Sequence, residues 1–464
     1  MATSKLRGKD LQKLGFPSHK VISIALGVMG RNYKKQSKEF KLNLLAQLLA
    51  KPENYEDDQI LGKIAQELIP PKEVDLTPLV EPKNYKIYGE EGIEEQAKFQ
   101  MQTAMKLPIT VGGALMADAH QGYGLPIGGV LATENAVIPY GVGVDIGCRM
   151  CLTLYDMPSN YIPRHRDKLK KILMENTRFG KATFDAPKDH DVLERKEFKE
   201  IPLLKNMQLK AFKQIGTSGG GNHFVEFGTT EILDEDNEFS LPTGHYMAVL
   251  SHSGSRGLGA FIAQHYTQLA MSQCKLPKGA KSLAWLDLDT EAGQEYWLAM
   301  NLAGDYASAC HHQIHERISK ALGEKHLAMV ENHHNFAWRE QLPDGKEVIV
   351  HRKGATPAGK GVLGVIPGTM TAPGFIVRGT GESESFASAS HGAGRVMSRM
   401  KAKQSLHKKY VKDYLKEHGV QLLGGGLDEA PMVYKDIHQV MRSQRELVEV
   451  VGTFLPKIVR MCDD

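Results

Sequence analysis

The chain has 464 residues, enough for two or three average domains or for one large domain with an appendage. Its hydrophobic fraction of 41% is ordinary for a globular protein, and a net charge of +4 is too small to indicate a nucleic-acid partner unless basic groups gather locally. Five irregularly spaced cysteines do not suit a disulfide framework, and no apolar run is long enough for a transmembrane helix or signal peptide. We therefore expect a cytoplasmic protein without membrane contacts.

The first 75 residues are predicted to form a small helical module. Apolar residues recur at helical spacing between Leu11 and Leu49. The segment Ile69-Pro-Pro71 then ends this pattern, because proline interrupts helices. We place the boundary of the N-terminal module at residue 75, so that residues 1–75 and 76–464 form separate domains.

Residues 76–464 show a different pattern, in which short β-rich segments alternate irregularly with long helical ones. The sequence predicts strands at 128–132, 248–251, 348–350 and 374–377 and helices at 163–176, 290–322 and 394–417. The charged segment 181–210 is expected to be an exposed insertion. Because the order is mixed rather than a regular βα alternation, the fold class is predicted to be α+β, with one large mixed-sheet catalytic domain.

A carboxylate and a thiol lie three residues apart in the glycine-rich segment 141–150. Asp145 offers a hard ligand and Cys148 a soft one, a pair that suits a borderline transition metal. The surrounding glycines permit a bent backbone that brings both side chains to one point. Taken alone, the pair is equally consistent with a buried strand end that carries an inert cysteine.

Three further motifs place histidines beside glycine, asparagine or arginine. A glycine-rich loop that could cradle phosphates leads into Asn222 and His223. An apolar segment delivers His252 into a turn with Arg256, and His334 precedes Asn335. Three such histidines, together with Asp145 and Cys148, are hard to explain by packing alone and favour a metal centre.

The fourth motif, at residues 390–399, contains His391, Arg395 and Arg399. Two arginines four residues apart would share one face of the predicted helix, with the histidine just before it. This arrangement suits a phosphate group, and it favours His391 as a nucleophile rather than a metal ligand.

These motifs, in this order, resemble the RtcB family of RNA-splicing ligases. The resemblance extends from about residue 116 to about residue 436 and rests on nine segments: 118–129, 141–150, 216–226, 251–257, 334–335, 351–356, 367–370, 390–399 and 428–436. It implies an enzyme that joins RNA 3′-phosphate or 2′,3′-cyclic phosphate ends to 5′-hydroxyl ends in RNA repair or tRNA splicing. It further implies GTP and two Mn²⁺ ions as cofactors.

The resemblance also assigns roles to residues. One Mn²⁺ ion would bind Cys148, His223 and His252, and the other would bind Asp145, Cys148 and His334. His391 would attack the α-phosphate of GTP and form a covalent guanylate, which passes to the RNA 3′-phosphate before the 5′-hydroxyl displaces GMP. The residues implied around GTP are Asn222, Glu226, Asn335, Pro367, Gly368, Thr369, Met370, Gly392, Ala393 and Gly394. Those implied near RNA or phosphates are Arg256, Arg395 and Arg399.

Two departures from the family pattern leave the choice of nucleotide open. The segment from Thr371 to Gly374 has no serine, whereas the family usually has one near Gly374 that contacts the nucleotide. The C-terminal segment is the second departure. The family has a lysine there that reaches guanine, and neither Lys457 nor Arg460 is in register with it. The need for an activating protein partner is also open.

Other readings remain beside the ligase. His311 and His315, four residues apart, are expected to have packing and surface roles on a helix, and Cys151 is expected to be dispensable. The basic run 399–409 is either a solvated face or an RNA-backbone contact. The alternative enzyme is a metal-dependent RNA-end phosphoesterase or cyclic-phosphate hydrolase without ligation. A non-catalytic RNA-binding protein is a third reading, but it would need neither the metal ligands nor His391.

Overall fold

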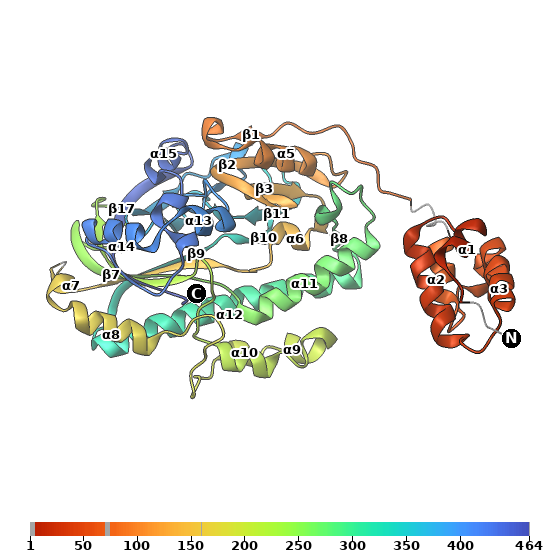
Figure 1. The fold of residues 1–464 in the computed structure, drawn as a ribbon. Helices are drawn as coiled ribbons and strands as arrows, with labels where there is room; N and C mark the ends of the chain where they lie inside the picture. The colour runs from red at the N-terminus through yellow and green to blue at the C-terminus, as the bar shows by residue number, and fades with distance from the viewer. Residues whose placement is uncertain (1–4, 70–74, 159, 464) are drawn as a thin grey trace. The chain divides into compact units, whose positions relative to one another are not determined.

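The computed structural model describes residues 5–69, 75–158 and 160–463, and the chain divides into two compact units, Met1–Asp75 and Leu76–Asp464 (Figure 1). The first unit is helical. Its helices are α1 (Gly8–Lys13), α2 (His19–Asn32), α3 (Lys38–Ala50) and α4 (Gly62–Leu68). Serine side chains cap α2 and α3 by accepting hydrogen bonds from Val21 and Phe40 backbone N–H groups. The apolar faces of these helices form a core of their own.

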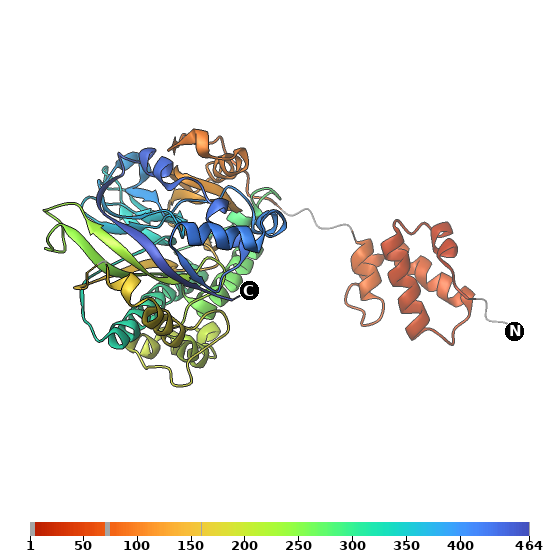
Figure 2. The same ribbon diagram turned by 60° about the vertical axis from the view of Figure 1, so that its left-hand side comes forward.

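The second unit contains a large sheet, mostly antiparallel, that supplies most of the candidate metal ligands. Its strands run in the order β13 (Leu363–Ile366), β14 (Gly374–Gly379), β17 (Val448–Met461), β6 (Phe224–Ile232), β7 (Gly244–Ser253), β5 (Arg149–Tyr155) and β9 (His326–His333), with β16 (Gln421–Leu423) paired parallel to β17. Figure 2 shows the long β17 beside the hairpin of β6 and β7.

A second sheet carries Asp118. Its order is β1 (Lys86–Ile87), β2 (Thr110–Tyr123), β3 (Leu125–Thr133), β11 (Glu347–Lys353) and β10 (Asn335–Gln341). Two small pairs complete the strands, namely β12 (Ala355–Pro357) with β15 (Ser388–Ser390) and β4 (Ala136–Val137) with β8 (Leu286–Asp287). The predicted α+β class with mixed sheets is therefore confirmed.

Helices cover the sheets and fill the gaps between them. Those of the second unit are α5 (Glu95–Ala104), α6 (Pro139–Val142), α7 (Tyr161–Arg164), α8 (Arg166–Asn176), α9 (Glu197–Glu200), α10 (Gln208–Gln214), α11 (Arg256–Gln273), α12 (Glu291–Leu322), α13 (Arg399–Ser405), α14 (Lys408–Glu417) and α15 (Ile437–Arg442). None of the helices in the described residues is both long and apolar enough to cross a membrane.

The buried helix α12 lies along one face of the large sheet (Figure 1). Alternate residues of β5 and β7 point to opposite faces, as the two-residue period of a strand requires. Tyr155 and Val249 pack on Ile314 and Ile318 of α12. Leu250, which directly follows Val249, belongs to a cluster on the opposite face of the sheet. The sheet thus lies between α12 and the hydrophobic cluster that contains Leu250.

Two sequence expectations about this unit are wrong. Residues 181–210 are not an exposed insertion, because Val192, Leu193 and Phe198 are buried in the main core. The segment 394–417 is not one helix, because Gly394 has φ +74° and the helix α13 begins only after its N-cap, Ser398. A second break, at Leu406–His407, separates α13 from α14.

Candidate active site

The five predicted metal ligands meet at one edge of the large sheet. Cys148 and His223 each precede a strand, whereas His252 and His334 lie at or just after the end of one. Neighbouring antiparallel strands bring such starts and ends to the same edge. The pairing of Arg149 with both Ser253 and His333 fixes this arrangement, and the backbone N–H of His334 donates to the carbonyl of Cys148 at 2.9 Å.

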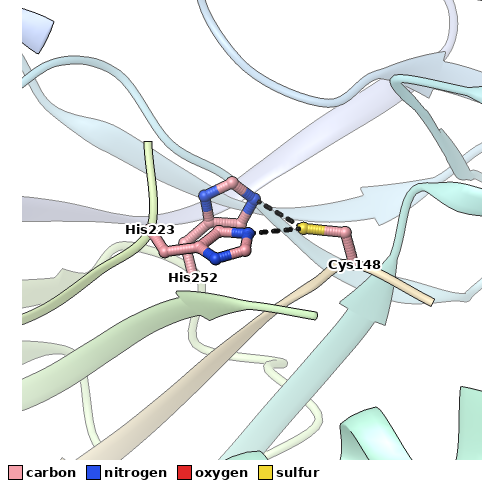
Figure 3. Close-up of side chains that lie close together, drawn as sticks. All are labelled: Cys148, His223 and His252. Atoms are coloured by element: carbon pink, nitrogen blue, oxygen red, sulfur yellow. Dashed lines mark hydrogen bonds between the residues drawn. The ribbon is translucent and has the colours of Figure 1, made fainter. Parts of the chain in front are cut away.

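The side chains of Cys148, His223 and His252 converge (Figure 3). Cys148 Sγ lies 3.4 Å from His223 Nε2 and 3.2 Å from His252 Nε2. His252 Nε2 is also 3.2 Å from His334 Nε2, and His223 Nε2 is 2.9 Å from Asp145 Oδ2. The thiol therefore lies at the centre of the group, with nitrogen and carboxylate donors around it.

The donor set fits a cation. His252 Nδ1 donates to the carbonyl of Asn222 at 3.0 Å, which leaves a lone pair on Nε2, and burial lowers the pKa of His252 to about 3. This lone pair faces Nε2 of His334, whose pKa burial also lowers well below its usual value. A neutral His334 can meet this lone pair only with an Nε2–H, which leaves its buried Nδ1 as an acceptor without a partner, and burial with the nearby Asp145 raises the pKa of the Cys148 thiol. Cations bound between these atoms would bind both Nε2 lone pairs and stabilise the thiolate.

Glycines allow the ligands to approach this closely. A Cβ atom on Gly254 would lie 2.1 Å from Asp145 Oδ1, and one on Gly219 would lie 1.9 Å from His223 Nδ1. Burial would raise the pKa of Asp145, but His223 and Cys148 lower it, and the net pKa is below its usual value. Asp145 is therefore an anion held against the histidine cluster.

His391 belongs to the same cavity but is held by a different element. It directly follows β15, and its Nδ1 donates to Oδ2 of Asp118 in β2 at 2.7 Å. The same oxygen accepts from the backbone N–H groups of His391 at 3.1 Å and Gly392 at 3.3 Å. Burial would raise the pKa of Asp118, but His391 lowers it, so the carboxylate is charged. With Nδ1 donating, Nε2 of His391 carries the lone pair that a nucleophile needs.

Most of the predicted site residues line one of two adjoining cavities. The larger cavity, of about 340 Å³, is lined by metal-ligand candidates Asp145, Cys148, His252 and His334 and also by His391, Asn335, Gly392, Ala393, Gly394, Arg395 and Arg399. The smaller one, of about 50 Å³, is lined by Glu226, Pro367, Gly368, Thr369, Met370 and Gly374. Asn222, Pro367 and Gly368 line both.

Glu226 is buried in the wall of the smaller cavity. Burial raises the pKa of its carboxyl group well above the usual value. A carboxyl group in such a place can form hydrogen bonds with a polar ligand. The expectation that Glu226 lies near GTP remains a prediction.

The arginines differ from their expected arrangement. Arg395 is not on a helix with Arg399, because it forms an isolated bridge with Tyr434, and its guanidinium donates to the carbonyl of Asp428 at 2.7 Å. Arg399 begins α13 and pairs with Asp428 at 2.9 Å and with Glu429. Both arginines thus face the cavity with part of their charge already neutralised.

Arg256 lies outside both cavities. It begins α11 with φ +56° and donates to Thr217 Oγ1 at 3.0 Å and to the carbonyl of Gly180. A non-glycine residue in this left-handed region is strained, so its neighbours hold it there. In the structure it fastens the glycine-rich loop rather than lining the site.

His311 and His315 have no surface role, contrary to expectation, because both are fully buried between α12 and the large sheet. Ser251 Oγ lies 2.6 Å from His311 Nδ1 and 2.7 Å from His315 Nε2, and Thr153 Oγ1 lies 2.8 Å from His315 Nδ1. With Cys151 these histidines form a second group of potential metal ligands. Their nitrogens, however, are already satisfied by hydrogen bonds.

No role for Asp118 followed from the sequence alone, although this residue begins the family segment 118–129. Its partner His391 is more than 270 residues away, and no spacing rule connects them. The only local signal was an acid two residues before His120, followed by a glycine-rich segment. The structure makes Asp118 the residue that orients His391.

Comparison with known proteins gives consistent matches. The sequence model of a family described as tRNA-splicing ligase RtcB matches residues 100–203 and 181–461. RNA-splicing ligase RtcB of Escherichia coli K12 is 35% identical over 403 residues, which cover 78% of this chain and 93% of that protein. tRNA-splicing ligase RtcB of Nanoarchaeum equitans is 31% identical over 436 residues, covering 79% and 91%. RNA-splicing ligase RtcB homolog 1 of Entamoeba dispar is 31% identical over 413 residues, covering 74% and 77%.

Proposed function

The chain belongs to the RtcB family of tRNA-splicing ligases, and from this premise we propose the chemistry of its site. The protein is a GTP- and Mn²⁺-dependent RNA ligase that joins 3′-phosphate or 2′,3′-cyclic phosphate ends to 5′-hydroxyl ends. The observation that carries this proposal is the hydrogen bond between His391 Nδ1 and Asp118 in the cavity that the metal-ligand candidates also line. A nucleophile and a cation site in one cavity suit nucleotidyl transfer.

Two Mn²⁺ ions would share the thiolate of Cys148. One would bind His223 and His252 in addition, and the other Asp145 and His334. When bound, the ions would act as Lewis acids that neutralise charge on the phosphates. The contact of His252 Nδ1 with the Asn222 carbonyl supports this assignment, because such a partner fixes the tautomer that leaves Nε2 as a ligand.

His391 would attack the α-phosphorus of GTP through Nε2. The new Nε2–P bond forms as the bond to pyrophosphate breaks, and the protonated Nδ1 keeps the imidazole oriented. Asp118 stabilises the positive charge that develops on the ring, because its buried carboxylate accepts the Nδ1 proton in a charge-assisted hydrogen bond. This is the role of the carboxylate partner of a catalytic histidine in general.

The nucleotide would extend from His391 into the smaller cavity. Asn222, Pro367 and Gly368 line both cavities and so lie where the two join. Glu226 and Thr369 line the deeper wall, where carboxyl and hydroxyl groups can bind the base or ribose. The serine that the family usually has near Gly374 is absent from this chain. Fewer side chains would therefore select guanine over other bases.

The guanylate would then pass to RNA in two steps. An oxygen of the RNA 3′-phosphate attacks the guanylate phosphorus, the Nε2–P bond breaks, and His391 is regenerated. The 5′-hydroxyl oxygen next attacks the activated 3′-phosphate, loses its proton to water, and displaces GMP. Activation is needed because an unmodified phosphate monoester has no good leaving group.

A ligation assay separates this function from the phosphoesterase alternative. An RNA with a 3′-phosphate and a second RNA with a 5′-hydroxyl are incubated with Mn²⁺ and either GTP or ATP. We expect a joined product that depends on GTP, together with release of GMP. Release of inorganic phosphate without joining would contradict the ligase and favour the phosphoesterase. Equal joining with ATP would contradict the choice of GTP but not the ligation.

A further inference from the structure

A basic groove lies outside the two cavities, between α14, α8 and the segment that leads from α14 to Leu427. We call it the α14 groove, and its volume is about 520 Å³. Its charged lining residues are Arg166, Lys408, Lys412 and Lys416, and no carboxylate lines it among the described residues. Four cations and no carboxylate in its described lining make this groove a candidate site for a polyanion.

The three lysines form one stripe along α14. They are four residues apart, so they share a face of the helix and follow one another with a rise of about 6 Å. Val411 and Leu415 are buried and fasten the helix to the protein beneath. All three lysines are exposed, and among the described residues none of their ammonium groups has an ion pair or hydrogen bond.

Glycines form much of the floor of the groove. Gly424 and Gly425 have φ +81° and +85°, a backbone that other residues rarely adopt, and Gly426 follows them. A Cβ atom on Gly424 would lie 2.6 Å from Arg460 Nη1, so this turn packs closely on the end of β17. The nearby carboxylate Asp463 is held by Arg460 at 3.1 Å and 3.2 Å. It therefore does not neutralise the lysines.

The groove lies next to the catalytic cavity in the chain and in space. Leu427 lines the groove, and the following residue, Asp428, pairs with Arg399 of the cavity wall. Helix α14 follows directly on α13, which begins with Arg399. A strand that leaves the cavity past Arg399 would thus meet the lysine stripe.

We propose that the α14 groove binds the phosphodiester backbone of the RNA strand that extends from the end being joined. This inference rests on the proposed function for its choice of RNA. Lysine contacts phosphates as a point charge, and no aromatic side chain lines the groove among the described residues. Binding is therefore through phosphates rather than stacked bases, and it is independent of sequence.

The test replaces the stripe with neutral residues of similar length and helix propensity, in the triple variant Lys408→Gln, Lys412→Gln, Lys416→Gln. Binding of a single-stranded RNA with a 3′-phosphate is measured over a range of salt concentrations. Each phosphate contact contributes about 0.7 to the slope of log K against log salt, so the slope should fall by about 2. Affinity at 0.1 M salt should fall on the order of 100-fold.

A matched control removes three exposed lysines elsewhere, in the triple variant Lys199→Gln, Lys205→Gln, Lys213→Gln. Its slope and affinity should stay near those of the unmodified protein. The inference is overturned if the groove variant keeps the full slope, as it would if the groove bound an acidic protein, or if both variants lose affinity equally.

Guanylate formation without RNA distinguishes failure of this inference from failure of the proposed function. The groove variant should form the guanylate at the normal rate, because none of its substitutions touches the cavity. If the unmodified protein forms no guanylate, the proposed function fails whatever the RNA slope shows. If the guanylate forms normally and the slope does not change, only the groove inference fails.

Discussion

Replacement of Asp118 by asparagine tests how His391 is oriented. All three hydrogen bonds to Asp118 converge on one oxygen, Oδ2, and two of them come from the backbone N–H groups of His391 and Gly392. These N–H groups would repel the amide nitrogen of asparagine, so its carbonyl oxygen should occupy the Oδ2 position. The Asp118→Asn variant therefore keeps the tautomer of His391 and loses only the charge of its partner.

The expected effect follows from this loss of charge. A hydrogen bond to a charged group contributes roughly 1.5–3 kcal/mol, and a neutral one contributes roughly 0.5–1.5 kcal/mol. The difference of about 1–2 kcal/mol corresponds to a guanylate-formation rate that is about 5- to 30-fold lower. Asp118→Ala should cost more, because it also leaves two backbone N–H groups without an acceptor.

The assay is single-turnover formation of the guanylate with α-labelled GTP and Mn²⁺. Asp156→Asn, at an exposed position, is the control and should react at the normal rate. The metal content of each variant is measured in parallel, so that loss of Mn²⁺ is not mistaken for loss of orientation. An Asp118→Asn variant that reacts at the unmodified rate, or more slowly than Asp118→Ala, would refute this reasoning.

Three further predictions concern the metal centre and the buried histidines. Gly254→Ala should weaken Mn²⁺ binding at least tenfold in a titration, because its Cβ would lie 2.1 Å from Asp145 Oδ1; unchanged affinity would show that Asp145 is not a ligand. Cys148→Ser should abolish guanylate formation, whereas Cys151→Ser should leave it unchanged, and equal effects would contradict a single bridging thiolate. Burial lowers the pKa of His315 to about 3, so below pH 6.5 the unfolded chain binds a proton that the folded chain does not. The free energy of unfolding in urea should therefore fall between pH 6.5 and pH 4, by up to about 1.4 kcal/mol per pH unit for this residue, and a His315→Gln variant with the same slope would contradict this.

The convergence of the candidate metal ligands could be predicted from the sequence because these residues lie in short, unusual motifs. Each of Cys148, His223, His252 and His334 stands beside the start or end of a strand, and glycines mark the places where backbone and ligand come close. The pairing of the strands brings these positions to one edge. The α+β class followed from the irregular order of helical and β-rich segments.

Long-range partners were not accessible in the same way. Asp118 acquires its role only when β2 and β15 are brought together, and neither spacing nor composition indicates that contact. The prediction of a single helix at 394–417 was wrong for a related reason. Glu429 and Tyr434, far along the chain, hold Arg395 in an extended segment, and this tertiary contact overrides a local helical pattern.

The segment 181–210 shows a limit of composition as evidence. Its many charged residues suggested an exposed insertion, but Val192, Leu193 and Phe198 are buried in the main core, and even Glu197 is buried, where Arg195 pairs with it. His311 and His315 have the expected packing role, but the surface role expected for them is wrong. Their polar rings are buried because Ser251 and Thr153 supply hydrogen bonds from the facing strands.

The most direct test of the account is to identify the residue that carries the guanylate. The protein is incubated with α-labelled GTP and Mn²⁺, digested under conditions that preserve phosphoramidates, and the labelled peptide is sequenced. The account predicts an acid-labile label on His391 that is lost in a His391→Ala variant. A label on any other residue, or one that persists in that variant, would contradict the proposed mechanism.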